Sequence, residues 1–407
     1  MERFATGAWL DRAMLRFAAG AMLAGTVVAV IYGVATRSGP YGTLDAWGRP
    51  LGTDFTLVWS AGQMVLEGRA AAVYDWATHQ AAQQAAHGTD AIPFFGWHYP
   101  PFFFLVAAAL APFPYLAALA LWQATTLAAA FAVVWRILPG RETLIAGLGF
   151  PAVFVCLAHG HNAFLTAALF GGGLLLLQRR PLLAGLLLGS LAYKPQLGII
   201  VPLALAAGGH WRAILGGAIS VAGLGLVTLA WFGLDVWSAF FASTHLTRTI
   251  VLEAGGTGWY KIQSAFSYVR MSGGSVSLAY AVQGAVSAAV IATTTWLWWI
   301  GAEFRLRAAA LMIGSLLVTP YLLDYDMVLL GPAIALIASH GLEHGFRRWE
   351  KTALAFAWFV PIATRQLAFF GHVPGGLLAM SVLFILVASR DLRESGAGLG
   401  ARIVPAR

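Results

Sequence analysis

Apolar segments long enough to cross a lipid bilayer recur along this chain. One runs from Phe17 to Thr36, and they follow one another almost continuously from Tyr99 onward. A membrane-spanning helix requires about 20 apolar residues. Only 10% of the residues are charged and 59% are hydrophobic, whereas an ordinary soluble domain is about 25% charged. The chain is therefore an integral membrane protein, and a disordered, fibrous or nucleic-acid-binding protein is excluded.

The apolar pattern predicts an all-α polytopic fold with about 11–13 transmembrane helices. A further stretch, Tyr99 to Pro112, is too short for an ordinary crossing and is either a short spanning helix or a re-entrant piece. The chain shows no internal repeat, so residues 1–407 are expected to form a single membrane domain. The predicted spans are 17–36, 115–138, 142–158, 161–178, 182–193, 196–208, 212–233, 277–302, 308–321, 326–339, 352–370 and 373–389.

Basic residues predict the orientation in the membrane. Arg and Lys cluster at the N-terminus, in several short loops and in a tail that begins at Arg390. With these clusters in the cytoplasm, the remaining loops are nearly neutral and face outward. The net charge of +8 thus reflects orientation, and we expect a cytoplasmic N-terminus with an uncleaved first span. The single cysteine, Cys156, lies in an apolar run and is expected to be a structural residue.

Two long polar segments, 37–98 and 235–275, interrupt the apolar runs and are expected on the outer side. In the first, Thr53 or Asp54 begins a predicted helix that ends near Leu66, and a second helix is expected from Ala71 to Ala86. Both are amphipathic and aromatic, as is typical of helices lying along a membrane surface. Asp54 is either a plain helix cap or a functional carboxylate.

Polar residues within or beside the apolar runs are candidates for a functional site. Trp97 precedes His98 and Tyr99, and its position is typical of the interfacial aromatic belt; His98 is suited to donate to an anionic group. Lys194 lies in LAYKPQLGIIVPL, and either snorkels to the interface or, with Gln196 beside the helix break at Pro195, binds a phosphate. The remaining candidates are His161 and Asn162, the DYD sequence formed by Asp324, Tyr325 and Asp326, and Arg248 in the second outward segment.

The DYD carboxylates are suited to hold a divalent cation, orient sugar hydroxyls or bind a proton. No nucleotide-binding loop, dinucleotide fingerprint or zinc-protease motif occurs in the sequence. We therefore predict no cofactor; no motif indicates a metal, and a divalent cation at the DYD carboxylates stays open. An activated substrate must come from elsewhere, and a donor carried on a lipid would need no nucleotide pocket.

The ordered segments DFTLVWSAGQMVLEGRAAAVYD, HYPPFFFLVAAALAPFPYLAALALW, GHNAFL, LAYKPQLGIIVPL and TPYLLDYDMVLL together resemble glycosyltransferase family 87, over roughly residues 50 to 340. The resemblance implies a GT-C type membrane enzyme that takes a sugar from a polyprenyl phosphate. It also implies that Asp54 is the catalytic base of an inverting displacement. Lys194, assisted by His98 or Arg248, is then expected to stabilise the leaving phosphate, with the other polar candidates contacting donor or acceptor sugars. Mannosyltransferase members often have histidines where this chain has Asp324-Tyr325-Asp326, so mannose, another hexose and a pentose all stay open.

The expected partners are a polyprenyl-phosphate-linked sugar, a glycan or glycolipid acceptor and membrane lipids, with no nucleic acid. The expected location is a bacterial inner membrane with the active site in the periplasm. The alternative is a transporter or flippase of lipid-linked sugars, in which Lys194, Asp324 and Asp326 form the translocation pathway. Related halves with matching broken helices are typical of transporters, and the sequence shows no such symmetry. A non-catalytic scaffold would leave the embedded lysine and paired aspartates unexplained.

Overall fold

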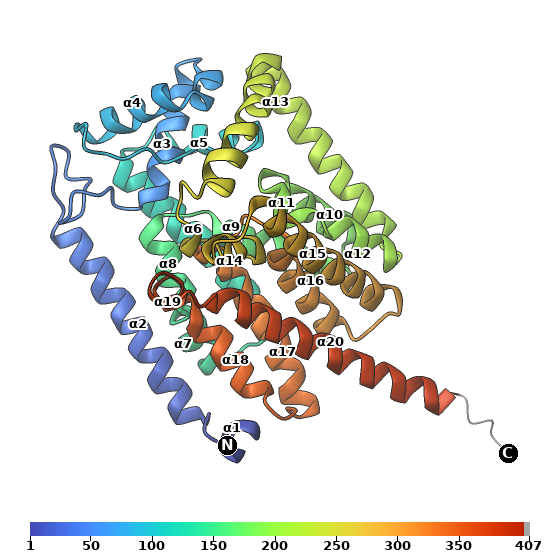
Figure 1. Cartoon of the computed structure of the whole chain (residues 1–407). Helices are drawn as coiled ribbons and strands as arrows, with labels where there is room; N and C mark the ends of the chain where they lie inside the picture. Colours follow the sequence, from blue (N-terminus) through green and yellow to red (C-terminus); the bar gives the residue numbers. More distant parts are fainter. Residues whose placement is uncertain (403–407) are drawn as a thin grey trace.

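The computed structural model describes the backbone of residues 1–402 and the side chains of residues 1–390, so the end of the predicted basic tail lies outside the described residues. The protein is 76% helical, and the described backbone forms no strand (Figure 1). The α-helices are α1 (Glu2–Ala5), α2 (Arg12–Ala35), α3 (Thr53–Leu66), α4 (Trp76–His87), α5 (Phe104–Leu110), α6 (Tyr115–Ile137), α7 (Arg141–Leu148), α8 (Pro151–His159), α9 (Ala163–Leu176), α10 (Pro181–Gly189), α11 (Pro195–Gly198), α12 (Val201–Ala207), α13 (Trp211–Leu246), α14 (Ala265–Met271), α15 (Val276–Trp299), α16 (Phe304–Val318), α17 (Leu330–His344), α18 (Glu350–Phe359), α19 (Thr364–Gly371) and α20 (Gly375–Arg402).

Short helical turns connect these elements. They are the 3₁₀ turns η1 (Ala70–Tyr74), η2 (Pro101–Phe103), η3 (Ser190–Tyr193), η5 (Trp259–Lys261), η6 (Asp324–Leu329) and η7 (Val360–Ile362), and the π-helical segment η4 (Thr247–Glu253).

Five helical segments in the described chain are long and apolar enough to cross a membrane: α2, α6, α13 with η4, α15, and η6 with α17. The pairs α7–α8 and α18–α19 raise this number to seven if each is one bent span, with bends of 44° and 75°. Further apolar helices of 10–17 residues lie between them. The all-α polytopic membrane fold expected from the sequence is confirmed, with the apolar segments divided between full-length and shorter helices.

Proline and glycine cause the breaks. The expected span 142–158 bends before Pro151, which starts α8, because proline cannot continue the helix that precedes it. The expected span 212–233 ends where α13 kinks at Gly233, whose φ of 79° and ψ of 177° are not helical. Only glycine adopts that conformation without strain.

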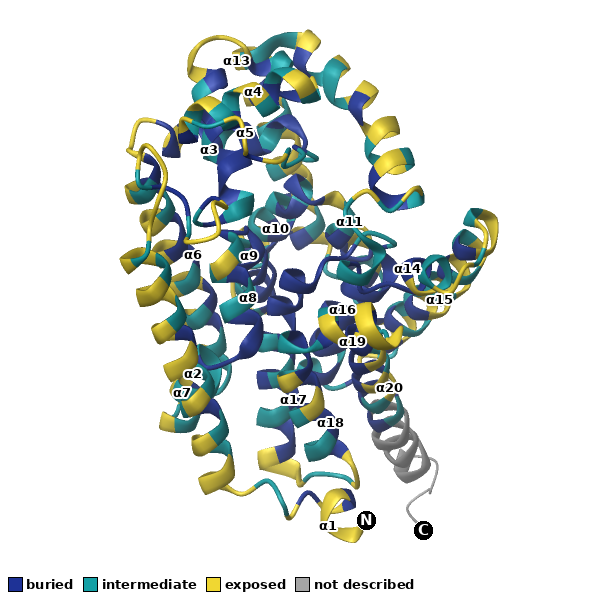
Figure 2. Cartoon of the chain, turned by 60° about the vertical axis from the view of Figure 1, so that its left-hand side comes forward, coloured by how far each residue is buried: buried dark blue, intermediate teal, exposed yellow. Residues whose placement is uncertain are grey.

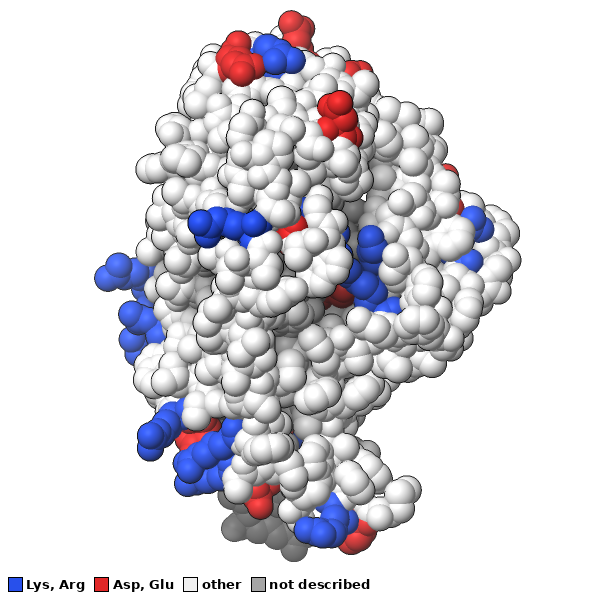
Figure 3. All heavy atoms as spheres, turned by 90° about the vertical axis from the view of Figure 1, so that its left-hand side faces the viewer, with Lys and Arg blue, Asp and Glu red and all other residues white. Residues whose placement is uncertain are grey.

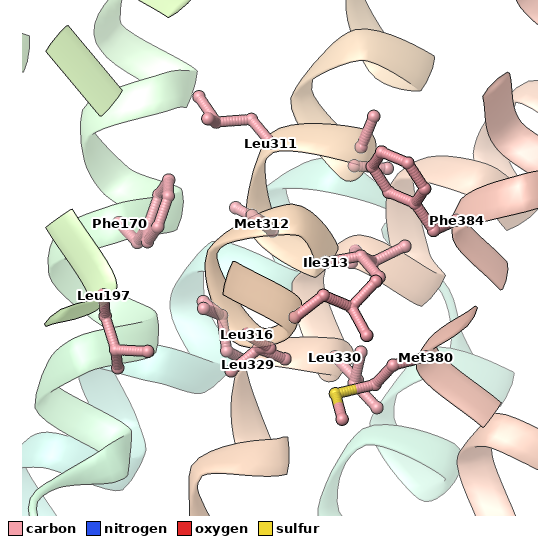
Figure 4. Close-up of a cluster of buried hydrophobic side chains, with 14 of the residues drawn as sticks. Phe170, Leu197, Leu311, Met312, Ile313, Leu316, Leu329, Leu330, Met380 and Phe384 are labelled. Carbon is pink, nitrogen blue, oxygen red and sulfur yellow. The ribbon is translucent and has the colours of Figure 1, made fainter. Parts of the chain in front are cut away.

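The main hydrophobic core surrounds α16. Twelve of its fifteen residues are buried, as expected for a helix that is apolar on every side. Figure 4 shows Leu311, Met312, Ile313 and Leu316 of α16 within one cluster of buried side chains. Leu329 of η6 and Leu330 of α17 belong to the same cluster, so the core anchors the turn that carries the DYD sequence.

A second, aromatic core lies beneath the first outward segment. Trp97 is 1% exposed, stacks on Phe104 with ring centroids 4.8 Å apart, and donates its indole N–H to the carbonyl of Tyr99. The expectation that Trp97 is an interfacial belt residue is therefore wrong. Phe103 stacks on Tyr193 in the same core, which ties the start of the α5 segment to the loop before Lys194.

The helices of segment 37–98 differ partly from expectation. α3 ends at Leu66 as predicted but begins at Thr53, which was expected, with Asp54, as a cap, and most of the helix is buried against α4 and α5, as Figure 2 shows. The second predicted helix, Ala71–Ala86, is wrong as one unit: it is divided into η1 and α4. Asp75 ends η1 and caps α4 by accepting a hydrogen bond from the Thr78 amide, which is a common way to begin a helix.

Two ends of the molecule are distinct. Figures 1 and 2 place α3, α4, α5 and the C-terminal part of α13 at one end, and the N-terminus with α1 at the other. α13 packs on η1 and η2. The first polar segment and the beginning of the second therefore lie together, as expected for segments on the same side of a membrane.

Candidate active site

The DYD sequence forms η6, a turn buried between α16 and α17. Asp324 is 2% exposed and Asp326 is 6% exposed. η6 packs against α8 and α9, which bring in His159 from the end of α8 and His161 from the following loop. Ionised carboxylates in such an interior need cations or hydrogen-bond donors to offset their lost hydration.

Lys194 supplies one of these cations. It lies between η3 and α11, where Pro195 starts a new helix and interrupts the chain. Its Nζ lies 2.6 Å from Asp326 Oδ1 and 3.5 Å from His161 Nε2, and its side chain is 4% exposed. The lysine does not snorkel to the surface, because its charge is neutralised inside the protein.

Arg365 of α19 supplies the second cation. Its Nε and one terminal nitrogen each donate a hydrogen bond to the Asp324 carboxylate at 2.8 Å, in the bidentate geometry that guanidinium and carboxylate groups favour. The same terminal nitrogen lies 3.4 Å from His159 Nε2. The sequence reasoning missed Arg365, although an arginine within the apolar stretch AFAWFVPIATRQLAFF is itself a signal of an embedded functional residue.

Asp54 approaches this network from α3. Gly52, not Thr53 or Asp54, occupies the N-cap position, and Asp54 in the first turn makes no capping bond. The Tyr325 side chain donates a hydrogen bond to its carboxylate, and His159, Asp324 and Arg365 lie within electrostatic range. Burial raises the pKa of Asp54, with His159 as the largest opposing influence.

The three site carboxylates thus differ in their pairing. Asp324 is paired with Arg365 and Asp326 with Lys194, whereas Asp54 forms no ion pair with any side chain that the structure describes. An unpaired carboxylate with a raised pKa is suited to accept a proton. Asp54 is the candidate base on these grounds of geometry and charge.

Two glycines bring α3 to this position. Gly52 and Gly160 both have left-handed backbones, with φ of 69° and 64°. A Cβ on Gly160 would lie 2.7 Å from Cβ of Phe55 and 3.1 Å from Cα of Gly52. The start of α3 therefore contacts the end of α8 through backbone atoms, and Asp54 faces His159 as a result.

Tyr99, His161 and Asn162 form a polar wall beside Lys194. The hydroxyl of Tyr99 lies 3.3 Å from His161 Nε2, and the His161 ring stacks on Tyr325 with centroids 3.5 Å apart. Asn162 is 2% exposed, and its side-chain amide lies within hydrogen-bonding reach of Tyr99 but forms no hydrogen bond of good geometry with the described atoms. Buried polar atoms are rarely left unpaired, so this wall is suited to bind hydroxyl groups.

The remaining predicted residues, His98, Gln196 and Arg248, make no contact with the ion pairs of the buried centre. His98 Nδ1 is 2.8 Å from the Thr247 hydroxyl, and burial lowers the pKa of His98 to about 4, so this imidazole is neutral at pH 7. Gln196 is half-buried on α11. Arg248 is 59% exposed and pairs with Glu253 at 3.4 Å, so the structure does not bring it into the buried network.

Lys261, which was not among the predicted site residues, lies near the buried carboxylates. Half-buried Lys261 is within electrostatic range of Arg365, Asp54 and Asp324, and burial lowers its pKa.

Figure 3 shows a face with wide uncharged areas, on which a few basic and acidic groups lie in a hollow. Among the described side chains, no three His, Cys, Asp or Glu residues are placed to hold a metal ion.

The fold and the site define a polytopic membrane protein with a buried centre of acidic and basic side chains. The sequence profile of glycosyltransferase family 87 matches residues 97–320, which is more than half of the chain. The protein belongs to this family and is a membrane glycosyltransferase. No curated protein and no solved structure matches the chain. The matched region includes Tyr99, His161 and Lys194 but neither Asp54 nor the DYD sequence.

The contact between Gly52 and Gly160 gives a testable prediction. We expect Gly160→Ala to lower sugar transfer at least tenfold, because the new methyl group pushes α3 and Asp54 away from His159. Gly209→Ala is the matched control: Gly209 also has a positive φ, of 72°, but no atom lies within 4 Å of its Cβ position. Both variants incur about 1–2 kcal/mol of left-handed strain. Equal transfer rates for the two purified variants would contradict the proposed role of the contact.

Proposed function

We propose that the protein transfers a sugar from a polyprenyl phosphate to a glycan or glycolipid acceptor, with Asp54 as general base. The observation that carries this proposal is the pairing of the site carboxylates: Asp324 and Asp326 are neutralised, and Asp54 is the one without a cation. Family membership supports the transfer of a sugar. The lack of a nucleotide-binding motif supports a donor carried on a lipid.

The reaction is a single in-line displacement. The acceptor hydroxyl oxygen attacks the anomeric carbon while the bond from that carbon to the phosphate oxygen breaks. The polyprenyl phosphate leaves with the bonding electron pair, and the hydroxyl proton passes to the Asp54 carboxylate. The anomeric configuration is inverted. General-base assistance of this kind contributes about 10²- to 10⁴-fold to the rate.

Cations near Asp54 stabilise the phosphate as it departs. Lys261 forms no ion pair with the described side chains and provides positive charge where negative charge develops. Arg365 lies within electrostatic range of Lys261 but is held by Asp324. Lys194 acts less directly, since its ammonium is held by Asp326. His98, as a neutral imidazole, provides a hydrogen bond, and the exposed Arg248 has no direct part.

Sugar hydroxyls bind to the wall formed by Tyr99, His161 and Asn162. The amide of Asn162 both donates and accepts and forms no hydrogen bond of good geometry with the described atoms. Tyr325 and the two paired aspartates lie near this wall, and Gln196 contacts sugar from further out on α11. A hexose, including mannose, or a pentose fits this set of groups. In this proposal positive charge from Lys261 takes the place of a metal ion near the departing phosphate.

The chemistry takes place at the periplasmic side of a bacterial inner membrane. Basic clusters lie with the N-terminus, and such clusters favour the cytoplasmic side. α3, which carries Asp54 in its first turn, lies toward the end of the fold opposite the N-terminus (Figure 1). A lipid-linked donor can reach that side, whereas nucleotide sugars are cytoplasmic substrates.

The direct test is to incubate the purified protein with a panel of polyprenyl-phosphate sugars and candidate acceptors. We expect mass spectrometry to detect a glycosylated acceptor with at least one donor, and none with the matching nucleotide sugars. A parallel assay in liposomes follows movement of the same labelled lipid across the bilayer. Movement without covalent transfer would contradict the proposal and favour a flippase.

The raised pKa of Asp54 predicts the pH dependence of transfer. The base must be ionised, so the rate falls as the pH decreases through the pKa of Asp54. Because burial raises this pKa, we expect the decline to begin well above the value of about 3.9 for an ordinary aspartate. The measurement is kcat against pH for the wild type. A flat profile down to the range of an exposed aspartate would rule out a buried carboxylate base.

A further inference from the structure

A long groove lies between α2 and the helical bundle, away from the site described above. Its volume is about 1030 Å³, at the upper end of the usual range for ligand pockets. At one end it reaches Phe164 and Val328, which closely follow Asn162 and Asp326 in sequence. At the other end it reaches Trp9, Arg12 and Lys351.

The walls of the groove are almost entirely apolar side chains from α2, α6, α7, α17 and α18. α2 runs along the flank of the molecule (Figure 1) and packs mainly against α7 and α8. Only 11% of the most apolar stretch of α2 is buried inside the protein. A hydrocarbon chain can therefore enter the groove sideways from the bilayer, with α2 as its outer wall.

The charged residues of the groove are confined to the end near the N-terminus. Asp11 accepts a hydrogen bond from the Met14 amide and caps α2, and Glu142 is paired with Arg16 at 2.6 Å. Arg12 lies within electrostatic range of Glu142 but forms no salt bridge with a described side chain. Lys351 likewise forms none.

The Lys351 ammonium lies over the Phe346 ring, 5.1 Å from its centroid. Of the two acidic groups at this end, Glu142 is neutralised by Arg16 and Asp11 caps the α2 N-terminus, so the cations of Arg12 and Lys351 leave a net positive charge at the mouth of the groove.

We propose that this groove binds one anionic phospholipid of the cytoplasmic leaflet. An acyl chain lies along the apolar wall, and the headgroup phosphate contacts Arg12 and Lys351. Basic pockets between transmembrane helices at the cytoplasmic side bind anionic headgroups in this way. The sugar donor is not the expected occupant, because under the proposed function its phosphate lies near Asp54 and not at the basic mouth of the groove.

The test uses native mass spectrometry of the purified full chain, with equimolar phosphatidylglycerol and phosphatidylcholine of identical acyl chains. Each basic residue near an anionic membrane surface contributes roughly a fivefold preference. We expect one phosphatidylglycerol to be retained at least tenfold over phosphatidylcholine. The double variant Arg12→Gln, Lys351→Gln loses this preference.

The matched control is Arg3→Gln with Arg136→Gln, which removes the same charge from the same end but from residues that do not line the groove. We expect this control to keep the preference of the wild type. Equal loss in both double variants would mean that net charge alone attracts the lipid, and would overturn the proposed site.

A second pair of variants tests the groove itself. Ala18→Trp places an indole inside the groove, and Ala13→Trp places one on an exposed residue of α2 that does not line it. We expect only Ala18→Trp to abolish lipid retention, with both variants eluting as the wild type does on size exclusion. Equal retention by the two variants, or displacement of phosphatidylglycerol by polyprenyl phosphate at equal concentration, would overturn the proposal.

Discussion

Asp54→Asn is expected to lower the rate of sugar transfer by about 10²- to 10⁴-fold while the protein stays folded. The amide has the size of the carboxylate but cannot accept the acceptor's proton. Because Asp54 makes no capping bond and no ion pair with the described side chains, its replacement breaks no structural contact of that kind. The measurement is kcat with a saturating lipid-linked donor.

Stability separates this explanation from a structural one. Burial raises the folded-state pKa of Asp54. The contribution of this group to the free energy of unfolding therefore decreases as the pH rises through that pKa. At pH 7 the amide removes this cost, and Asp54→Asn should melt at or above the temperature of the wild type. Asp90→Asn, on an exposed residue of the same segment, is the control and should change neither property. A large fall in melting temperature for Asp54→Asn would indicate a structural role.

Lys194→Met is expected to produce the largest loss of stability. It leaves Asp326 buried without its cation, and breaking a buried ion pair by removing one partner costs about 3–5 kcal/mol. The melting temperature of the purified variant should fall markedly. Lys351→Met, which removes a lysine that forms no ion pair with the described side chains, should have little effect. A melting temperature equal to that of the wild type would show that Asp326 does not depend on Lys194.

The double variant Lys194→Met, Asp326→Leu tests whether the stability loss comes from the uncompensated charge of Asp326. Replacing both partners with apolar residues leaves no uncompensated charge, and such replacements are often neutral or stabilising. We expect the double variant to recover most of the melting temperature lost in Lys194→Met. Transfer should stay impaired, since both charges of the Lys194–Asp326 pair are gone. Recovery of both properties would indicate that the pair serves only the fold.

The parts of the fold that were predicted correctly depend on local sequence. The end of α3 at Leu66 follows from the apolar pattern of the residues before it, whereas α13 continues past the predicted end at residue 233 and only kinks at Gly233. The division of helix 71–86 was missed although Asp75 and Thr78 form a recognisable cap. Trp97 was misplaced because its burial depends on Phe104 and the second core, which the residues around it do not reveal.

The candidate site was predictable as a set of residues but not as a set of pairs. Lys194, Asp326 and Asp324 are conspicuous because charges are scarce in apolar segments. Which cation meets which carboxylate depends on the packing of η6 against α8 and on the bend before α19. Arg365 is 41 residues from Asp324, and Asp54 becomes the unpaired carboxylate only once both pairs have formed.

The central claim is that Asp54 accepts the proton when a lipid-linked sugar is transferred. Its most direct test is a parallel time course for wild type and Asp54→Asn, in which mass spectrometry counts polyprenyl phosphate released and glycosylated acceptor formed. The account predicts one lipid phosphate for each product in the wild type and no more than background for the variant. Equal release and product formation by the two proteins would contradict it.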